Sequence, residues 1–447
     1  MSDLHRRPLL DVAASLRRGE VTSVEVVEHL LDRIAAVDER LHSYITVDAT
    51  GALAAARRAD AERAAGHDRG PLHGIPVAVK DNLATAQLRT TYNSRSMADA
   101  VPAVDEPAVA RLRVAGAVIL GKTNLNEFGW SLPSDADLCP PVRNPWQPEL
   151  ASVGSSSGSA AAVAAGLACA ALGTDGGGST RLPAGQHGQV GLKPTRGAVP
   201  REASFVTDLS VVGILARNAD DAAALHDAVA DRPVGPLGTS IRDLRLGVPR
   251  ALMDEVAVED EVRAGFEESV AVLRDLGVHV ENIELPELTM ARAAAFVLIT
   301  TGGFADHEDE LHARLDLIGP VTRRYMLTGV FASGADVLRA QRVRELVTAA
   351  LDIRLAGLDG VLSAMSPVIT AEAARIPGEH RKGRNAAFTS PFNLTGWPAV
   401  AIPSHVSSYG LPIGFQIAGR PGQERTLLDA AKAYGAVTGV QDLCAPI

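Results

Sequence analysis

The chain has 447 residues, of which 46% are hydrophobic and 21% are charged. This composition is typical of a globular protein that can bury an active site, and it excludes disordered, collagen-like and coiled-coil classes. The formal net charge of −10 disfavours direct binding to nucleic acid, whose partners are usually basic. The three widely spaced cysteines, Cys139, Cys169 and Cys444, indicate neither a disulfide framework nor a metal knuckle.

The sequence gives no sign of a membrane segment or a targeting segment. Asp11 interrupts the apolar stretch near the N-terminus, which argues against a signal peptide. The longest run of small apolar residues, 160–173, is too short to cross a bilayer. We therefore expect a cytoplasmic protein without a membrane partner.

The first half of the chain begins with helices. Thr22 followed by Glu25 forms a capping box, which is typical of a helix start. Apolar residues then recur at helical spacing, at Val27, Leu30, Leu31, Ile34 and Val37. Farther along, the patterns predict helices over 51–65, 106–115 and 160–172, and strands over 74–80 and 117–120.

In the second half, strands and helices alternate. The sequence predicts strands over 244–249, 278–284, 359–364, 398–402 and 412–418, and helices over 258–276, 288–300, 335–356 and 424–437. There is no long polar linker and no tandem repeat, so one large domain is favoured over three small ones. We expect an α/β fold in which helices cover both faces of a central mixed, mostly parallel twisted sheet.

One short motif suggests nucleotide binding. Residues 116–123, Gly-Ala-Val-Ile-Leu-Gly-Lys-Thr, fit the phosphate-loop pattern. A phosphate loop follows a strand, and its middle residues turn around the phosphates. Here the middle residues are apolar and favour a strand themselves, so we interpret Gly116 as a turn between a helix and a strand that ends at Gly121. Nucleotide binding remains a remote alternative.

Two Gly/Ser-rich segments could carry chemistry. Residues 152–159 open directly onto a helix of small residues that has no polar face, which indicates a buried helix rather than a linker. Residues 173–183 contain Gly176, Gly177 and Gly178, followed by Ser179. Consecutive glycines let several backbone amides converge on one anion, and a serine beside such donors is suited to nucleophilic attack.

A nucleophilic serine also needs a base. None of the twelve histidines lies in a recognisable triad motif, and no G-x-S-x-G elbow is present. Lys80 is an alternative base because it ends an apolar strand, where burial would lower the pKa of its amine.

Together, these segments resemble the amidase signature family. The matching stretch runs over 154–195, and shorter matches lie at 74–82, 120–124, 127–128, 143–146, 389–396 and 410–416. The resemblance divides a single amidase domain, 1–447, into an N-terminal helical part (about 1–65), a signature core (about 70–230), a variable substrate-shaping region (about 240–385) and a C-terminal return to the core (about 387–440).

The resemblance implies a Ser–cisSer–Lys triad. Lys80 matches the family's lysine, Ser155 the bridging serine held by a cis peptide bond, and Ser179 the nucleophile. Gly176, Gly177 and Gly178 match the oxyanion-hole stretch, and Asp175 and Arg181 match supporting polar positions. The implied reaction proceeds through an acyl-enzyme and needs no metal or cofactor.

The sequence departs from the family pattern after Ala184, where the usual apolar stretch is replaced by Gly-Gln186-His187-Gly-Gln. Gln186 and His187 either pack in the interior or shape the substrate pocket. Other candidate pocket residues are Trp130, in the loop after Glu127, and Arg381 and Arg384, which could hold a substrate carboxylate or instead belong to a solvated loop.

The resemblance leaves two functions open. The first is a stand-alone amidase that cleaves a small amide or ureido compound and releases ammonia or an amine, as a monomer or a homodimer. The second is a glutaminase-type A subunit of a tRNA-dependent amidotransferase, which would need partner subunits. The loop after Glu127 lacks the Ser-Thr-Glu-Asn-type stretch associated with that subunit.

Overall fold

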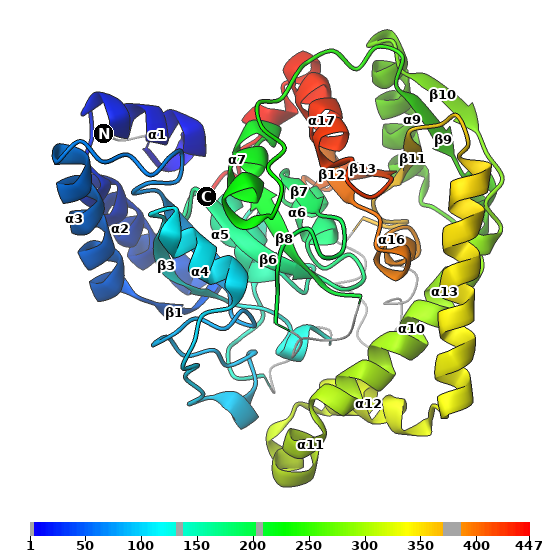
Figure 1. Cartoon of the computed structure of the whole chain (residues 1–447), viewed down its shortest axis with the longest axis horizontal. Coiled ribbons are helices and arrows are strands. Elements are labelled where there is room, and N and C mark those ends of the chain that lie inside the picture. Colours follow the sequence, from blue (N-terminus) through cyan, green and yellow to red (C-terminus); the bar gives the residue numbers. More distant parts are fainter. Residues whose placement is uncertain (1–3, 131–136, 203–208, 370–385) are drawn as a thin grey trace.

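Most of the chain is built on one eleven-stranded sheet. The computed structural model describes residues 4–130, 137–202, 209–369 and 386–447 (Figure 1). The strand order is β1-β3-β2-β6-β8-β7-β12-β13-β11-β9-β10. These strands are β1 (Tyr44–Val47), β2 (Pro76–Lys80), β3 (Val118–Thr123), β6 (Ala170–Asp175), β7 (Val190–Lys193), β8 (Val211–Ala216), β9 (Arg245–Val248), β10 (His279–Asn282), β11 (Gly360–Ala364), β12 (Ala399–Val406) and β13 (Pro412–Gly419); β4 (Arg143–Asn144) and β5 (Gln147–Ala151) form a separate pair.

The sheet is mixed, as predicted, but it is not mostly parallel. The parallel pairs are β2 with β3, β2 with β6, β9 with β10 and β9 with β11. The other six neighbouring pairs are antiparallel. One reason lies in the connections, because β12 and β13 are joined by a short turn, which permits only antiparallel neighbours.

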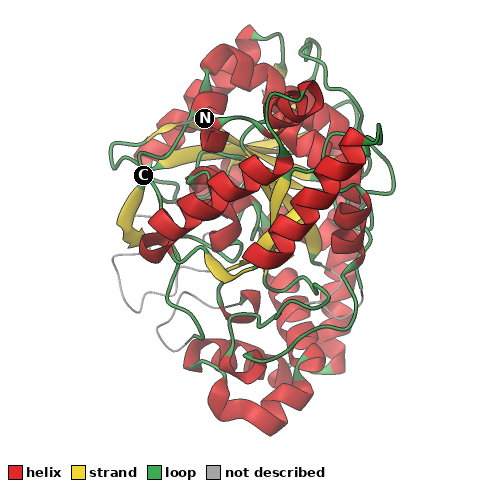
Figure 2. Cartoon of the chain, turned by 90° about the vertical axis from the view of Figure 1, so that its left-hand side faces the viewer, coloured by secondary structure: helices red, strands yellow, loops and turns green. Residues whose placement is uncertain are grey.

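Helices lie on both sides of the strands (Figure 2). They are α1 (Leu9–Arg18), α2 (Ser23–Leu41), α3 (Ala49–Ala64), α4 (Pro107–Val114), α5 (Ser157–Ala164), α6 (Arg181–Gln186), α7 (Ala219–Val229), α8 (Arg250–Glu255), α9 (Asp260–Asp275), α10 (Glu287–Asp306), α11 (Glu308–Arg314), α12 (Pro320–Thr328), α13 (Gly334–Arg354), α16 (Ser390–Thr395) and α17 (Glu424–Thr438). Short 3-10 turns are η1 (Leu4–Arg6), η2 (Arg95–Met97), η3 (Glu127–Gly129), η4 (Leu315–Leu317), η5 (Gly329–Phe331) and η6 (Val440–Asp442).

The longer predicted helices are confirmed. At the start of α2, the Thr22 side chain accepts from the amide of Glu25 at 3.1 Å, and the amide of Thr22 donates to the Glu25 carboxylate at 2.7 Å. The predicted helices over 258–276 and 335–356 correspond to α9 and α13. Amphipathic spacing sustained over several turns therefore located α2 and α9 correctly.

The predicted helix over 160–172 is wrong in its second half. Helix α5 ends at Ala164, Gly166 takes a left-handed φ of 69°, and β6 begins at Ala170. Every residue of α5 and β6 is buried. A segment that is buried on all sides has no amphipathic period, so its pattern could not separate helix from strand.

Parallel neighbours β2 and β6 position the candidate site. Lys80 is the last residue of β2, and Asp175 is the last residue of β6. Carboxyl ends of parallel strands meet at the same edge of a sheet, where ligands commonly bind in α/β proteins. The catalytic candidates from two distant sequence segments therefore start from adjacent strand ends.

Candidate active site

The amine of Lys80 lies among three hydroxyl groups. Its Nζ is 2.8 Å from Oγ of Ser155, 3.0 Å from Oγ of Ser156 and 2.8 Å from Oγ1 of Thr174. The Lys80 side chain is fully buried, and Ser155 is only 5% exposed. The sequence prediction that Lys80 and Ser155 meet is thus matched by their positions, whereas Ser156 and Thr174 were not anticipated as contacts of the amine.

Burial changes the acidity of this lysine. Desolvation lowers the pKa of Lys80 well below its ordinary value, although the negative charge of Asp175 acts in the opposite direction. A buried amine loses the hydration that stabilises its protonated form, so burial favours the neutral form. The amine can then accept a proton.

The segment that carries Ser155 lies directly beside the Ser179 turn. The peptide bond between Gly154 and Ser155 is cis, as the family resemblance implied. The next amide, of Ser156, donates to the carbonyl of Ser179 at 3.0 Å. This bond joins the two Gly/Ser-rich segments. Ser179 itself is half-buried, at the border between the interior and the surface.

Backbone amides of the glycine stretch differ in their partners. The amide of Gly178 donates to the Asp175 carboxylate at 2.7 Å, so it is turned inward. Within the part of the chain that the structure describes, no acceptor is recorded for the amides of Gly176, Gly177 or Ser179. Among the described residues, the Gly178 amide is thus engaged with Asp175, whereas these three amides keep their donor capacity.

A buried ion pair supports this turn. The Arg181 guanidinium donates to both carboxylate oxygens of Asp175, at 3.0 Å each, and both side chains are fully buried. Burial alone would raise the pKa of the Asp175 carboxyl, but the charge and hydrogen bonds of Arg181 hold it well below its usual range. Asp175 is thus a permanent anion that fixes the backbone around Ser179.

Contacts from the C-terminal segment complete the support. Arg181 also donates to the side chains of Gln416 at 2.9 Å and Asn393 at 2.7 Å, and Asn393 donates to the Asp175 carbonyl at 2.8 Å. The hydroxyl of Thr389 donates to the carbonyl of Gly177 at 2.6 Å. Sequence reasoning missed these roles, although the family-like segments 389–396 and 410–416 contain all three residues.

Comparison with known proteins places the chain in a family. A sequence model described as "Amidase" matches residues 25–428. The chain belongs to the amidase family. Among its relatives, the A subunit of the glutamyl-tRNA(Gln) amidotransferase from Roseiflexus sp. (strain RS-1) is 37% identical over 482 residues, covering 98% of each protein.

Solved structures of amidases have the same fold. One amidase crystal structure is 30% identical, has a TM-score of 0.89 and covers 97% of this chain and 100% of its own. The peptide amidase from Stenotrophomonas maltophilia is 29% identical, has a TM-score of 0.83 and covers 97% of each chain. The family and the fold implied by the sequence resemblance are therefore confirmed.

Within this amidase fold, the candidate pocket residues occupy different environments. Trp130 packs with Phe128 in a small second core, where its ring leaves no room for a side chain at Gly303 of α10. Gln186 lines a cavity of only about 20 Å³ together with Met365. Arg381 and Arg384 lie outside the described residues.

His187 is an interior residue that joins two parts of the amidase site. Its Nδ1 lies 2.7 Å from the carbonyl of Pro183, which can only accept, so Nδ1 carries the proton. Its Nε2 therefore accepts from the hydroxyl of Ser152 at 2.7 Å. Burial lowers the pKa of His187 to about 4, so the ring stays neutral and links the end of α6 to the segment preceding Ser155.

The phosphate-loop motif is part of the amidase core. Residues 118–123 form β3, and Lys122 is fully buried, where it donates to Thr85 at 3.0 Å, to Thr90 at 2.8 Å and to the carbonyl of Leu83. The strand continues past Gly121, where we expected it to end. A strand with a buried, fully engaged lysine cannot wrap phosphates, so the nucleotide-binding alternative is wrong.

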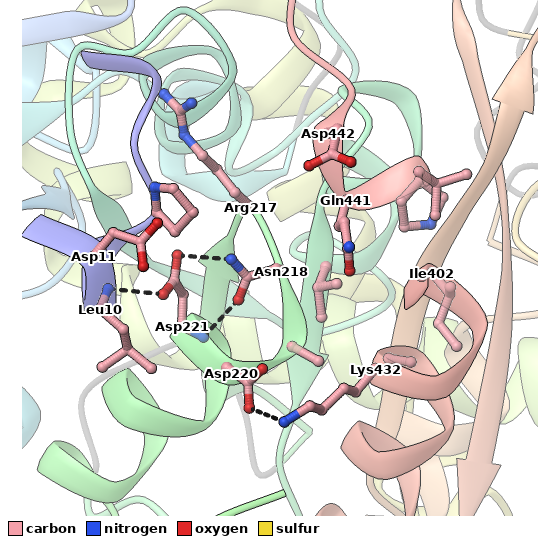
Figure 3. Close-up of a pocket in the computed structure, with 17 residues that line it drawn as sticks. Leu10, Asp11, Arg217, Asn218, Asp220, Asp221, Ile402, Lys432, Gln441 and Asp442 are labelled. Atoms are coloured by element: carbon pink, nitrogen blue, oxygen red, sulfur yellow. Dashed lines mark hydrogen bonds and ion pairs between the residues drawn. The ribbon is translucent and has the colours of Figure 1, made fainter. Parts of the chain in front are cut away.

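A larger cavity of about 460 Å³ lies away from Lys80, between α1, α7, β12, α17 and η6 (Figure 3). Several of its charged side chains have protein partners. Asp221 accepts the amides of Leu9 and Leu10 at 2.8 and 3.0 Å, and Lys432 donates to Asp220 at 2.9 Å. The first two contacts anchor the start of α1 to α7, and the third joins α17 to α7. None of the three triad candidates lines this cavity.

Proposed function

We propose that the chain hydrolyses a carboxamide through an ester formed on Ser179, with Ser155 and Lys80 moving the protons. The observation that carries this proposal is the buried Lys80 amine, 2.8 Å from the Ser155 hydroxyl and with a lowered pKa. A neutral amine held in this way can act as a general base near neutral pH.

Hydrogen-bond accounting supports Ser155 as the relay. The Ser156 hydroxyl donates its single proton to the carbonyl of Thr174 at 3.1 Å, so it can only accept from Lys80. The Thr174 hydroxyl already accepts from the side-chain amide of Asn82 at 3.1 Å. Of the two remaining hydroxyls, that of Ser155 belongs to the segment whose next amide bonds to the Ser179 carbonyl, so we propose Ser155 as the relay.

The reaction then balances without a cofactor. Ser179 Oγ attacks the amide carbonyl while its proton passes to Ser155, whose own proton passes to Lys80. The amides of Gly176, Gly177 and Ser179 stabilise the negative oxygen. Removing one such donor commonly raises the activation free energy by about 3–4 kcal/mol. As the C–N bond breaks, the relay returns the proton to the leaving nitrogen, and water then hydrolyses the ester.

A fluorophosphonate probe tests this assignment. We expect stoichiometric labelling of Ser179 in an active preparation and no labelling of Ser179→Ala. The same preparations should be assayed for ammonia release against a panel of primary amides, secondary amides and ureido compounds. An active protein that the probe leaves unlabelled would refute the proposal.

A second candidate is glutamine hydrolysis within an amidotransferase. It is favoured by the 37% identity, over 98% of both chains, to the A subunit of a glutamyl-tRNA(Gln) amidotransferase. In this case glutamine is the amide, the ammonia passes to a partner, and the isolated chain has little activity. Gel filtration and a glutaminase assay, each with and without candidate partner proteins, separate this candidate from a stand-alone amidase.

We propose that Arg381 and Arg384 hold a substrate carboxylate, which predicts a raised KM for the Arg381→Ala and Arg384→Ala proteins. Unchanged KM values would refute this role. One described helix, α10, is long and apolar enough to cross a membrane, but it packs against α12, α13 and α16. We propose that the chain is a single domain and that it is located in the cytoplasm.

A further inference from the structure

The polar stretch at the end of α6 has no part in the proposed mechanism. The chain carries Gln186 and His187 at positions where the family resemblance implied apolar residues. His187 is only 1% exposed, and both of its ring nitrogens have a partner, the Pro183 carbonyl and the Ser152 hydroxyl. A buried ring that is hydrogen-bonded on both sides holds the two groups that it joins at a fixed separation.

One end of this link lies on the helix that follows Ser179. Helix α6 begins two residues after Ser179, and it contains Pro183. The amide of Leu182 donates to the carbonyl of Gly178 at 2.8 Å, so the helix is hydrogen-bonded directly to the glycine stretch. The position of the His187 ring is therefore fixed relative to the turn that carries Ser179.

The other end of the link lies on the segment that leads to Ser155. Ser152 precedes Ser155 by three residues, and its amide donates to the carbonyl of Val142 at 2.8 Å. Between Val142 and Ser152 lies the β4–β5 hairpin, whose turn carries Trp146. The indole nitrogen of Trp146 donates to the carbonyl of His187 at 3.1 Å. His187 thus holds this hairpin both at its turn and at its base, just before Ser155.

The contact between Ser152 and His187 is not a second nucleophile and base. Its geometry has the pattern of such a pair, because the hydroxyl lies 2.7 Å from Nε2 and a carbonyl holds the other ring nitrogen. Ser152 is only 2% exposed, however, so a substrate cannot reach its oxygen. The contact can act only on the position of the chain around it.

We propose that His187 is a positioning residue for Ser155, acting through Ser152 and the β4–β5 hairpin. This inference rests on the proposed function, in which Ser155 passes a proton between Ser179 and Lys80. The Ser155 hydroxyl lies 2.8 Å from the Lys80 amine, and a shift of about 1 Å would break a hydrogen bond of this length. Misplacement by this distance can lower a rate by about a hundredfold.

Inactivation by a fluorophosphonate probe measures the rate of attack by Ser179 separately from the binding of the probe. His187→Phe removes the acceptor for the Ser152 hydroxyl. It should lower the inactivation rate constant about ten- to a hundredfold and leave the dissociation constant of the probe unchanged. The matched control is Tyr434→Phe, which removes a buried hydrogen bond to Ser269 between α17 and α9. This control should react at the wild-type rate.

A double-variant cycle tests the route through Ser152. Ser152→Ala removes the same contact with little change in volume, and it also serves if His187→Phe does not fold. It should slow inactivation by about the same factor, and the double variant should be no slower than either single variant. Effects that multiply in the double variant, or a folded His187→Phe that reacts at the wild-type rate, would overturn the proposal.

Crystal structures of the variants separate this inference from the proposed function. In His187→Phe, the distance from Lys80 Nζ to Ser155 Oγ should exceed about 3.5 Å, whereas Tyr434→Phe should keep the 2.8 Å contact. A wild type in which the probe does not label Ser179 would refute the proposed function, and the distance would still decide whether His187 positions Ser155. An unchanged distance in His187→Phe would overturn the inference.

Discussion

Replacing Asp175 with asparagine should destabilise the protein strongly. The change keeps the shape of the side chain but removes the charge that neutralises Arg181, and both side chains are fully buried. Breaking one partner of a buried ion pair typically costs about 3–5 kcal/mol, because the remaining charge is left uncompensated. The unfolding equilibrium constant should therefore rise by about two to three and a half orders of magnitude.

Urea unfolding followed by tryptophan fluorescence measures this cost, since the chain has three tryptophans. The control is the double variant Asp175→Asn/Arg181→Met, in which neither charge remains. Because the neutral pair has no uncompensated charge, it should be more stable than Asp175→Asn alone. A cost of Asp175→Asn below about 1 kcal/mol, or strictly additive costs, would refute the reasoning.

The same pair predicts a pH dependence. The folded-state pKa of Asp175 is depressed below the unfolded value of about 3.9, so its stabilisation is fully present above that value. It is lost as the pH falls toward the folded-state pKa. The stability difference between wild type and Asp175→Asn should therefore be constant above about pH 5 and shrink in more acidic solution.

Three further predictions concern lysine and histidine residues in the core. Lys80→Met should lower kcat/KM at least about a thousandfold while the protein stays folded. The wild-type kcat/KM should rise with pH as the amine loses its proton and should level off below about pH 10. A pH-independent wild-type profile would contradict this role of Lys80. His187→Phe leaves the Ser152 hydroxyl without its acceptor and should cost about 1–3 kcal/mol in urea unfolding, whereas no measurable cost would argue against the linkage. Lys122→Met removes the cation 3.8 Å from Asp81 and should lower the free energy of unfolding by about 3–5 kcal/mol. Isothermal titration of the wild type with Mg-ATP should show no binding.

The sequence predicted most of the fold where a pattern was amphipathic. Helices α2 and α9 each have one solvent-facing side, so polar and apolar residues alternate with helical period. The strand β6 was missed because it is buried on both faces and continues an alanine-rich run from α5. Strand direction was misjudged because the spacing of elements does not reveal which strands become neighbours.

The site, like the fold, was predicted only where a local sequence pattern marks it. Lys80, Ser155 and Ser179 were identified by resemblance, and the structure places Lys80 against Ser155 as expected. The contacts of Arg181 with Asn393 and Gln416 join residues more than two hundred positions apart, and no local pattern encodes them. The inward turn of the Gly178 amide depends on the position of the Asp175 carboxylate, which only coordinates reveal.

The distance in sequence between Arg181 and its partners has a consequence for biosynthesis. Arg181 is translated more than two hundred residues before its partners Asn393 and Gln416. Until they arrive, the guanidinium has only part of its hydrogen bonding, and β7 lacks its neighbour β12. A nascent chain therefore cannot complete the support of the turn around Ser179 before residues 393 and 416 have been made.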